Sequence, residues 1–173
     1  YSSSVDAVTI VVNKLATTLY PFSVAPSTIA IEQIVIMTAT LKDENTKAVS
    51  NANIDYYVKV ENRWTKIDSA LTDGNGIASL DYTPTVTGAL LIKANYTGSS
   101  KYLSSNSEPT IITVNKLATT LTLSMPTTAK VEQTIMISVT LKDANQKTIP
   151  TVTINYTLLT PSQEQAIGSA KTD

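Results

Sequence analysis

The side chains that most often carry out catalysis are scarce in this sequence. It has neither cysteine nor histidine, so thiolate nucleophiles, disulfides and the commonest general base are excluded. Serine with lysine is the familiar nucleophile and base pairing that remains, but serine is too frequent for its presence to indicate a site. Paired carboxylates single out no position either. We therefore predict a protein that is not an enzyme and that needs no cofactor.

Carboxylates and amides in short polar segments offer oxygen atoms of the kind that bind calcium. They recur at a spacing typical of tight turns, in Asp43, Asn45, Asp73, Asn75 and Asp143. Calcium needs about six to eight convergent oxygen ligands. Turn formation alone explains the spacing here, since Asp, Asn and Gly accept the positive φ angles of tight turns. We predict turns at these positions and no metal site.

Two sequons for N-glycosylation are present, at Asn95 and at Asn155. In the strand pattern described below, the tyrosines that follow them, Tyr96 and Tyr156, fall on inward-facing positions, so both asparagines should face solvent. A glycan at either site would shield the surface of a sheet. The alternative is that the sequons arise by chance in a chain rich in Asn and Thr, and are unused.

Trp64 is the only tryptophan, and it lies beside a predicted turn. An exposed aromatic side chain at such a place often marks a contact with a partner, which makes Trp64 a candidate for binding. The alternative is a ring that covers the edge of the core. Ile34 and Ile36 are predicted to face outwards, where the second half of the chain has Thr134 and Met136, and could mark a surface between subunits.

The charge of the chain argues against nucleic acid as a partner. Its 13 basic and 14 acidic residues are dispersed and leave a net charge of −1. A membrane-spanning helix needs about 20 apolar residues, and apolar runs such as ALLI at residues 89–92 are far shorter, so we predict no membrane-spanning segment. The first residue is tyrosine and no signal peptide is visible, so we expect a fragment or a mature form.

An internal repeat organises these residues. The segment VNKLATTL at residues 12–19 recurs unchanged at 114–121, residues 31–47 resemble 131–147, and residues 69–73 resemble 169–173. The period of about 100 residues is the length of one domain.

The repeat predicts three parts of the chain. Residues 1–14 are the final strand of a preceding repeat, residues 15–115 are a complete domain, and residues 116–173 are a second domain that stops after about four strands. We expect a truncated or partial repeat array rather than strand donation between chains. Residues 5–13 would supply one strand, and the second domain lacks more than one.

Alternation of apolar and polar residues predicts β-strands throughout and no helix. The complete copy has predicted strands near residues 16–24, 32–42, 53–60, 64–71, 77–83, 89–97 and 109–115. The second copy shows the same alternation at residues 117–125, 134–141 and 152–158. Each strand has one polar face, as expected for an antiparallel β-sandwich.

The segment IDSALTDGNGIASL at residues 67–80 is followed by Tyr82-Thr83-Pro84 and by LIKANYTG at residues 91–98. These segments resemble the immunoglobulin-like repeats of bacterial and archaeal cell-surface proteins, and the resemblance covers nearly the whole chain. It implies an all-β fold of tandem immunoglobulin-like antiparallel sandwiches, the last of them incomplete, and an extracellular location. Such repeats occur in adhesin stalks, surface-layer proteins, filaments and appendages of secreted enzymes, so the resemblance specifies activity poorly.

The joint between copies consists of the same three residues at both boundaries: Asn13, Lys14, Leu15, Asn115, Lys116 and Leu117. The strand pattern continues through it with no Gly, Pro or Ser spacer, which predicts a stiff rod. The alternative is that the identical residues reflect a recent duplication. An isopeptide bond from Lys14 or Lys116 to a buried Asn or Asp would be a further role, but the spacing singles out no partner.

We therefore predict a non-catalytic structural repeat of an extracellular, cell-surface protein or filament, which acts as a stiff spacer or an assembly unit. Its expected partners are copies of itself or neighbouring repeats, and surface glycans. Two alternatives remain. The chain could be a carbohydrate- or protein-binding adhesin module that uses loops around Trp64 and Asp73, or an accessory domain of a secreted hydrolase.

Overall fold

A computed structural model describes residues 8–173 of the chain. The chain divides into two compact units, of which the first ends at Lys116 and the second comprises Leu117–Asp173. All regular elements within residues 8–173 are β-strands, and no helix is present there. The predicted all-β fold class is confirmed.

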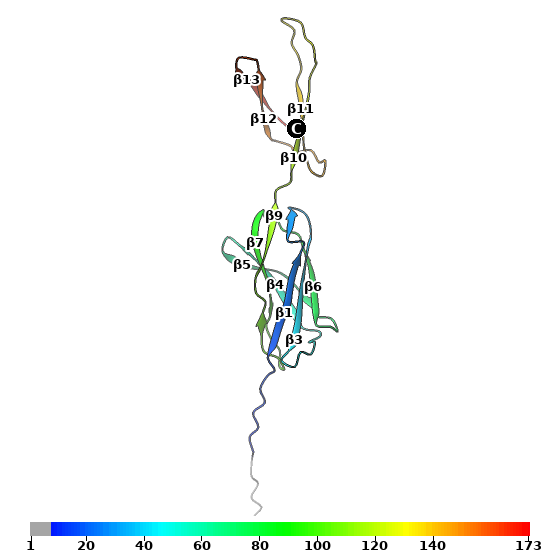
Figure 1. Cartoon of the computed structure of the whole chain (residues 1–173), viewed down its shortest axis with the longest axis vertical. Helices are drawn as coiled ribbons and strands as arrows, with labels where there is room; N and C mark the ends of the chain where they lie inside the picture. The colour runs from blue at the N-terminus through cyan, green and yellow to red at the C-terminus, as the bar shows by residue number, and fades with distance from the viewer. Residues whose placement is uncertain (1–7) are drawn as a thin grey trace, which may run out of the picture. The chain divides into compact units, whose positions relative to one another are not determined.

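Unit 1 is a sandwich of two sheets (Figure 1). The first sheet has the order β1-β3-β6 and consists of β1 (Thr17–Ala25), β3 (Val35–Asp43) and β6 (Ile77–Tyr82). The second has the order β2-β9-β7-β4-β5 and consists of β2 (Thr28–Ala30), β9 (Thr110–Asn115), β7 (Gly88–Tyr96), β4 (Asn53–Val60) and β5 (Arg63–Leu71). The short β8 (Ser105–Asn106) pairs with β7. Neighbouring strands are antiparallel except β2 and β9, which are parallel.

The strands predicted for the complete copy are all present, with ends shifted by no more than three residues. Two short strands, β2 and β8, were not predicted. β2 has three residues, too few for alternation to reveal a strand. It forms because it lies beside β9, which follows about 80 residues later in the chain.

The core of unit 1 lies between its two sheets. In β3, Val35, Met37 and Leu41 alternate with outward-facing residues and are inaccessible to solvent. Tyr56 in β4 packs its ring into the same core, and its hydroxyl donates a 2.8 Å hydrogen bond to the carbonyl oxygen of Ala78. Burial raises the pKa of Tyr56 to about 12, because the ionised phenolate would lose its hydration.

Unit 2 repeats four strands of unit 1. They form two antiparallel pairs, β10 (Thr119–Ser124) with β11 (Ser138–Asp143) and β12 (Thr153–Leu159) with β13 (Glu164–Lys171). The registers match as well, since Leu121 lies opposite Leu141 as Leu19 lies opposite Leu41. The four strands therefore correspond to β1, β3, β4 and β5.

Two predicted strands of unit 2 are shorter than expected, and β10 covers only residues 119–124 of the predicted 117–125. Alternation predicts a strand over residues 134–141, but β11 begins at Ser138. In unit 1 the equivalent residues 35–37 all pair with β6, and residues 36 and 37 pair with β1 as well. No counterpart of β6 is present among the described residues of unit 2, so residues 135–137 lack that support.

The inner face of unit 2 is open. Its apolar side chains line a groove of about 740 Å³: Leu121, Leu123, Met125, Ile135, Ile137, Val139, Ile154, Tyr156, Leu158, Leu159 and Ile167. The effect of a second sheet on burial is clearest at Leu19 and Leu121, which occupy the same position in the two copies of the repeat. Leu19 is 3% exposed beneath the second sheet of unit 1, whereas Leu121 is 53% exposed.

Residues 8–14 precede the first strand and form no strand themselves. The repeat makes Ile10 and Val12 equivalent to Ile112 and Val114 of β9, which are buried, yet Ile10 and Val12 are 80% and 88% exposed. They have no sheet to join within the described residues. The interpretation of residues 1–14 as the last strand of a preceding repeat stays a prediction, and residues 1–7 lie outside the described part.

Candidate functional site

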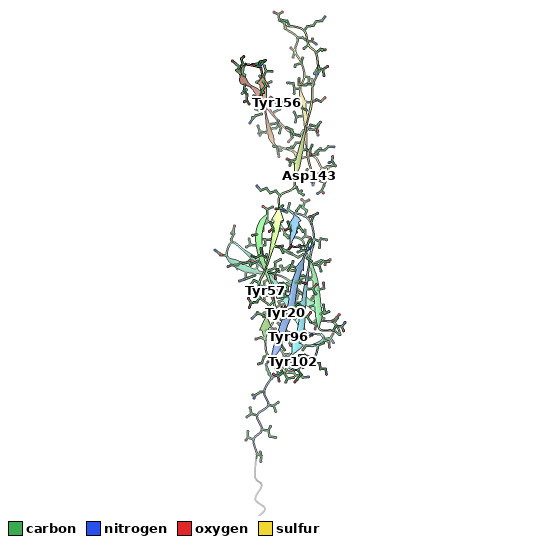
Figure 2. The ribbon with its side chains drawn as sticks, viewed as in Figure 1. Tyr20, Tyr57, Tyr96, Tyr102, Asp143 and Tyr156 are labelled. Atoms are coloured by element: carbon green, nitrogen blue, oxygen red, sulfur yellow. The ribbon has the colours of Figure 1, made fainter. Side chains whose placement is uncertain are left out.

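A group of aromatic and charged side chains lies on the outer face of the second sheet of unit 1. We call it the aromatic–lysine cluster, and its members are Asp55 and Tyr57 on β4, Trp64 and Lys66 on β5, and Lys93 on β7. The strand register brings them together, because Tyr57 lies opposite Lys66 on one neighbouring strand and opposite Lys93 on the other. Figure 2 labels Tyr57 among the strands of unit 1.

Lys93 is the centre of the cluster. Its Nζ lies 4.5 Å from the ring centroid of Trp64 and 5.8 Å from that of Tyr57. Both distances fall within the range of cation–π attraction, which contributes about 0.5–1 kcal/mol at an exposed site. Beside it, Lys66 Nζ lies 2.7 Å from Asp55 Oδ1, and this hydrogen-bonded pairing raises the pKa of Lys66. The cluster therefore has one paired lysine and one lysine held over two rings.

Trp64 is half-buried in β5, at the edge of the sheet, and does not stand free on a loop. Both the interpretation of a ring that covers the edge and the role of Trp64 as a contact residue stay predictions. Sequence reasoning missed Tyr57 and Lys93 as its neighbours. The available signal was that both fall on the outward parity of their strands, but the register between β4, β5 and β7 is needed to bring them to Trp64.

The three acidic segments form tight loops with the same hydrogen-bond pattern. In each of the three, Asp43, Asp73 or Asp143 accepts two backbone N–H bonds at Oδ1, from the residues two and four positions later, at 2.8–3.0 Å. The carboxylate is thus used to close the loop. Within residues 8–173 there is no group of three or more acidic side chains that could hold a metal ion.

The positive φ angle in each of these loops falls on the residue three positions after the aspartate. Gly76 has a φ of 77°, and the equivalent positions in the other two loops are Thr46 at 62° and Gln146 at 64°. The prediction named Asp, Asn and Gly as residue types that accept such angles, and in these loops Gly76 adopts one while Asn45 and Asn75 do not. Their backbone N–H groups donate hydrogen bonds to the aspartate Oδ1, and the backbone at these two residues keeps a negative φ angle.

The sequon asparagines lie where the strand pattern placed them. Asn155 is exposed, and Asn95 is half-buried because it lies between Asp55 and Asn106 on neighbouring strands, while Tyr96 is buried. Both asparagines belong to the outward-facing set of the same sheet in the repeat frame. Glycosylation at Asn95 or Asn155 stays a prediction.

The joint residues are mostly exposed, and the strand pattern does not run through them as predicted. β9 ends at Asn115 and β10 begins at Thr119, with no strand at residues 116–118. At the first boundary Leu15 is fixed to unit 1, since its N–H donates to Lys101 O at 3.0 Å and its carbonyl oxygen accepts from Leu103 N–H at 2.8 Å.

The other joint residues are Asn13, Lys14, Asn115, Lys116 and Leu117; of these, Leu117 is half-buried and the rest are exposed. The isopeptide hypothesis for Lys14 or Lys116 stays a prediction. The stiffness of the joint stays a prediction.

Ile34 and Ile36 face outwards as predicted, 55% and 49% exposed. They lie at the start of the first sheet's central strand, on the opposite side of the sandwich from the aromatic–lysine cluster. No helix in the described part of the chain is long and apolar enough to cross a membrane.

Comparison with known families agrees with this architecture. The profile of the bacterial Ig-like domain family, group 3, matches residues 22–115, which is more than half of the chain. The matched segment spans β2 to β9 and the last four residues of β1. No curated protein matches the sequence. The chain belongs to the bacterial Ig-like domain family, group 3.

Proposed function

We propose that this chain is a non-catalytic module of a cell-surface protein, which transmits tension along the polypeptide as a spacer or assembly unit. Bacterial Ig-like domains occur on surface proteins and are typically non-catalytic, and unit 1 carries the fold of that family. The observation that carries the proposal is the way in which segments near the start of unit 1 are bonded in parallel to segments near its end.

The two ends of unit 1 are held by parallel contacts. Near its entry, Leu15 forms a parallel bridge with Tyr102. Near its exit, β2 pairs in parallel with β9, where Thr113 N–H donates to Ser27 O and Ile31 N–H donates to Asn115 O, both at 2.8 Å. The chain enters unit 1 at one end of the sandwich and β9 leaves at the other (Figure 1).

This arrangement suits a module under tension. A force applied between the two ends acts along the strands, so it shears β9 past β2 and loads their hydrogen bonds together. Each such bond contributes about 0.5–1.5 kcal/mol on its own, but under shear several must break in one event. A hairpin pulled apart at its open end would instead lose its bonds one after another.

The joint supports the same role. Residues 114–118 contain no Gly, Pro or Ser, and flexible linkers are rich in Gly and Ser. A short joint of this composition limits bending between consecutive units, so the units would act as a stiff rod. The natural partners in this proposal are neighbouring repeats of the same kind, in a filament, a surface layer or an adhesin stalk.

An extracellular position is supported by the family, whose domains occur on surface proteins, and is consistent with the two sequons. Asn95 and Asn155 present their side chains on the outer face of a sheet, where a glycan would not disturb the core. The protein purified from its source should therefore lose mass on deglycosylation. Labelling of intact cells with an antibody to unit 1 tests the location directly.

Single-molecule force spectroscopy tests the tension-bearing role. Thr113→Pro removes the N–H that bonds Ser27 O, in the β2–β9 pairing, while Thr113 itself is exposed. Val58→Ala is the control, because Val58 lies in β4, outside that pairing, and is 5% exposed. We expect Thr113→Pro to lower the unfolding force of unit 1 more than Val58→Ala does, when the two are compared per unit of lost equilibrium stability. Equal effects on that scale would contradict the proposal.

A binding role is the second candidate, because the aromatic–lysine cluster provides a surface that the fold does not require. A carbohydrate- or protein-binding module would lose its ligand on Trp64→Ala while the fold remained intact. No observation favours the third candidate, an accessory domain of a secreted hydrolase.

A further inference from the structure

The two copies of the repeat differ sharply on the face that carries the aromatic–lysine cluster. Core residues of the β4–β5 hairpin recur in the β12–β13 hairpin, with Ile54, Tyr56, Ile67 and Ala70 matched by identical residues 100 positions later. The cluster residues do not recur. Asp55, Tyr57, Trp64 and Lys66 are replaced as follows: Asn155, Thr157, Glu164 and Ala166.

This difference indicates that the cluster residues have a role other than the folding of the hairpin. The same hairpin register forms in both units, with Tyr57 opposite Lys66 and Thr157 opposite Ala166. The hairpin therefore needs neither the two rings nor the lysines. Large aromatic side chains on an outward face are costly to solubility unless they cover something or bind something, which points to a ligand for this face.

The charged side chains on this face indicate whether the ligand carries positive or negative charge. Asp55 is engaged by Lys66 at 2.7 Å, and this is the one ion pair among the described residues. Lys93 is held over the two rings, and Lys59 lies opposite Trp64 on β4. Two cations on the face are thus left without a carboxylate in ion-pair contact.

We propose that the aromatic–lysine cluster binds an anionic glycopolymer, a chain of sugars that carry carboxylate or phosphate groups. The rings of Trp64 and Tyr57 are partly exposed, and where Lys93 leaves them uncovered their electronegative surface attracts the C–H hydrogens on one side of a sugar ring. Lys93 and Lys59 pair with the anionic groups. A flat, outward sheet face with rings and ammonium groups at neighbouring positions suits an extended polymer better than a small molecule.

The binding site is separate from the tension-bearing contacts. Its residues lie on β4, β5 and β7, whereas the tension-bearing pairing joins β2 to β9. Loss of glycopolymer binding would leave the mechanical proposal untouched, and the reverse also holds.

Trp64 makes the test direct, because the emission of the only tryptophan reports on the cluster itself. The full chain, produced without glycosylation so that no glycan at Asn95 competes, is titrated with alginate as a polyuronate, with a poly(glycerol phosphate) glycopolymer, and with neutral dextran. Emission follows contact at Trp64, and calorimetry gives the affinity. We expect binding to one or both anionic polymers, a change in Trp64 emission, weakening by added salt, and no binding to dextran.

The variant Lys93→Met keeps an unbranched side chain on the rings and removes the charge. Its matched control is Lys101→Met, since Lys101 Nζ lies 5.0 Å from the ring centroid of Tyr102, outside the cluster. We expect Lys93→Met to weaken binding about tenfold or more, as for loss of a charge-assisted contact, and Lys101→Met to change it less than about twofold. Circular dichroism checks that both variants fold.

Three results would overturn the proposal. They are failure of both anionic polymers to bind, equal binding of dextran, and equal weakening by the two lysine substitutions, which would indicate unspecific attraction to the whole surface. Binding of alginate alone or of the phosphate polymer alone supports it and identifies the anionic group.

Discussion

Two leucines in identical sequence surroundings should differ strongly in their contribution to stability. Leu19 and Leu121 are the last residues of the repeated segment VNKLATTL, and each lies opposite a leucine of the neighbouring strand. Leu19 is 3% exposed and Leu121 is 53% exposed. Replacement of a buried leucine by alanine removes apolar contacts and leaves a cavity, at a cost of about 2–5 kcal/mol. At Leu121 half of the transfer free energy is absent and no closed cavity forms, so the expected cost is about 1 kcal/mol.

Urea denaturation followed by tryptophan emission measures this difference. Trp64 lies in unit 1, so its emission reports the unfolding of that unit, while far-ultraviolet circular dichroism reports both. We expect Leu19→Ala to move the Trp64 transition to a lower urea concentration by the equivalent of 2–5 kcal/mol. Leu121→Ala acts in unit 2, so its smaller cost of about 1 kcal/mol is measured from the circular dichroism transition of that unit, and the Trp64 transition stays in place. If Leu121→Ala cost unit 2 as much as Leu19→Ala costs unit 1, or if Leu19→Ala cost less than about 1 kcal/mol, burial beneath the second sheet would not be what stabilises this segment.

Two further predictions concern the core and one loop. Because the pKa of Tyr56 is raised from 10.0 to about 12 in the folded chain, its contribution is complete below pH 10 and is lost as the pH rises through 12, a loss of up to about 3 kcal/mol. Urea denaturation across this range should show a steeper fall for the native sequence than for Tyr56→Phe; equal slopes would contradict the assignment. Gly76→Ala should destabilise unit 1 by about 2 kcal/mol or more, since φ is 77° and a Cβ would lie 2.5 Å from Leu41 O. Gly74→Ala, where a Cβ meets nothing within 4 Å, should cost about 1 kcal/mol or less, and equal costs would refute the steric explanation.

The strands of unit 1 were predictable because each buries one face, and alternation records that burial directly. β2 was not, since three residues carry no period and its order depends on β9, far along the chain. The same limit applies to the aromatic–lysine cluster. Trp64 drew attention by its type, but its contact with Lys93 follows from the pairing of β5, β4 and β7, which no local pattern encodes.

The loops show a different limit. Turn positions followed from Asp and Asn at the expected spacing, yet the residue with positive φ is Thr46 in one loop and Gln146 in another, neither of which favours that conformation. The Asp43 and Asp143 side chains impose it by bonding the backbone on both sides of the bend. Side-chain hydrogen bonds can thus override local preference, and the sequence does not reveal that in advance.

The direction dependence of mechanical strength tests the central claim most directly. Because the chain has no cysteine, pairs of introduced cysteines define the points of attachment without interference. Unit 1 is pulled through residues 13 and 116, which shears β2 against β9, and separately through Asn53 and Leu71, the partners at the open end of the β4–β5 hairpin. We predict a clearly higher unfolding force between the chain ends than across the hairpin. An equal or lower force between the ends would contradict a tension-bearing role.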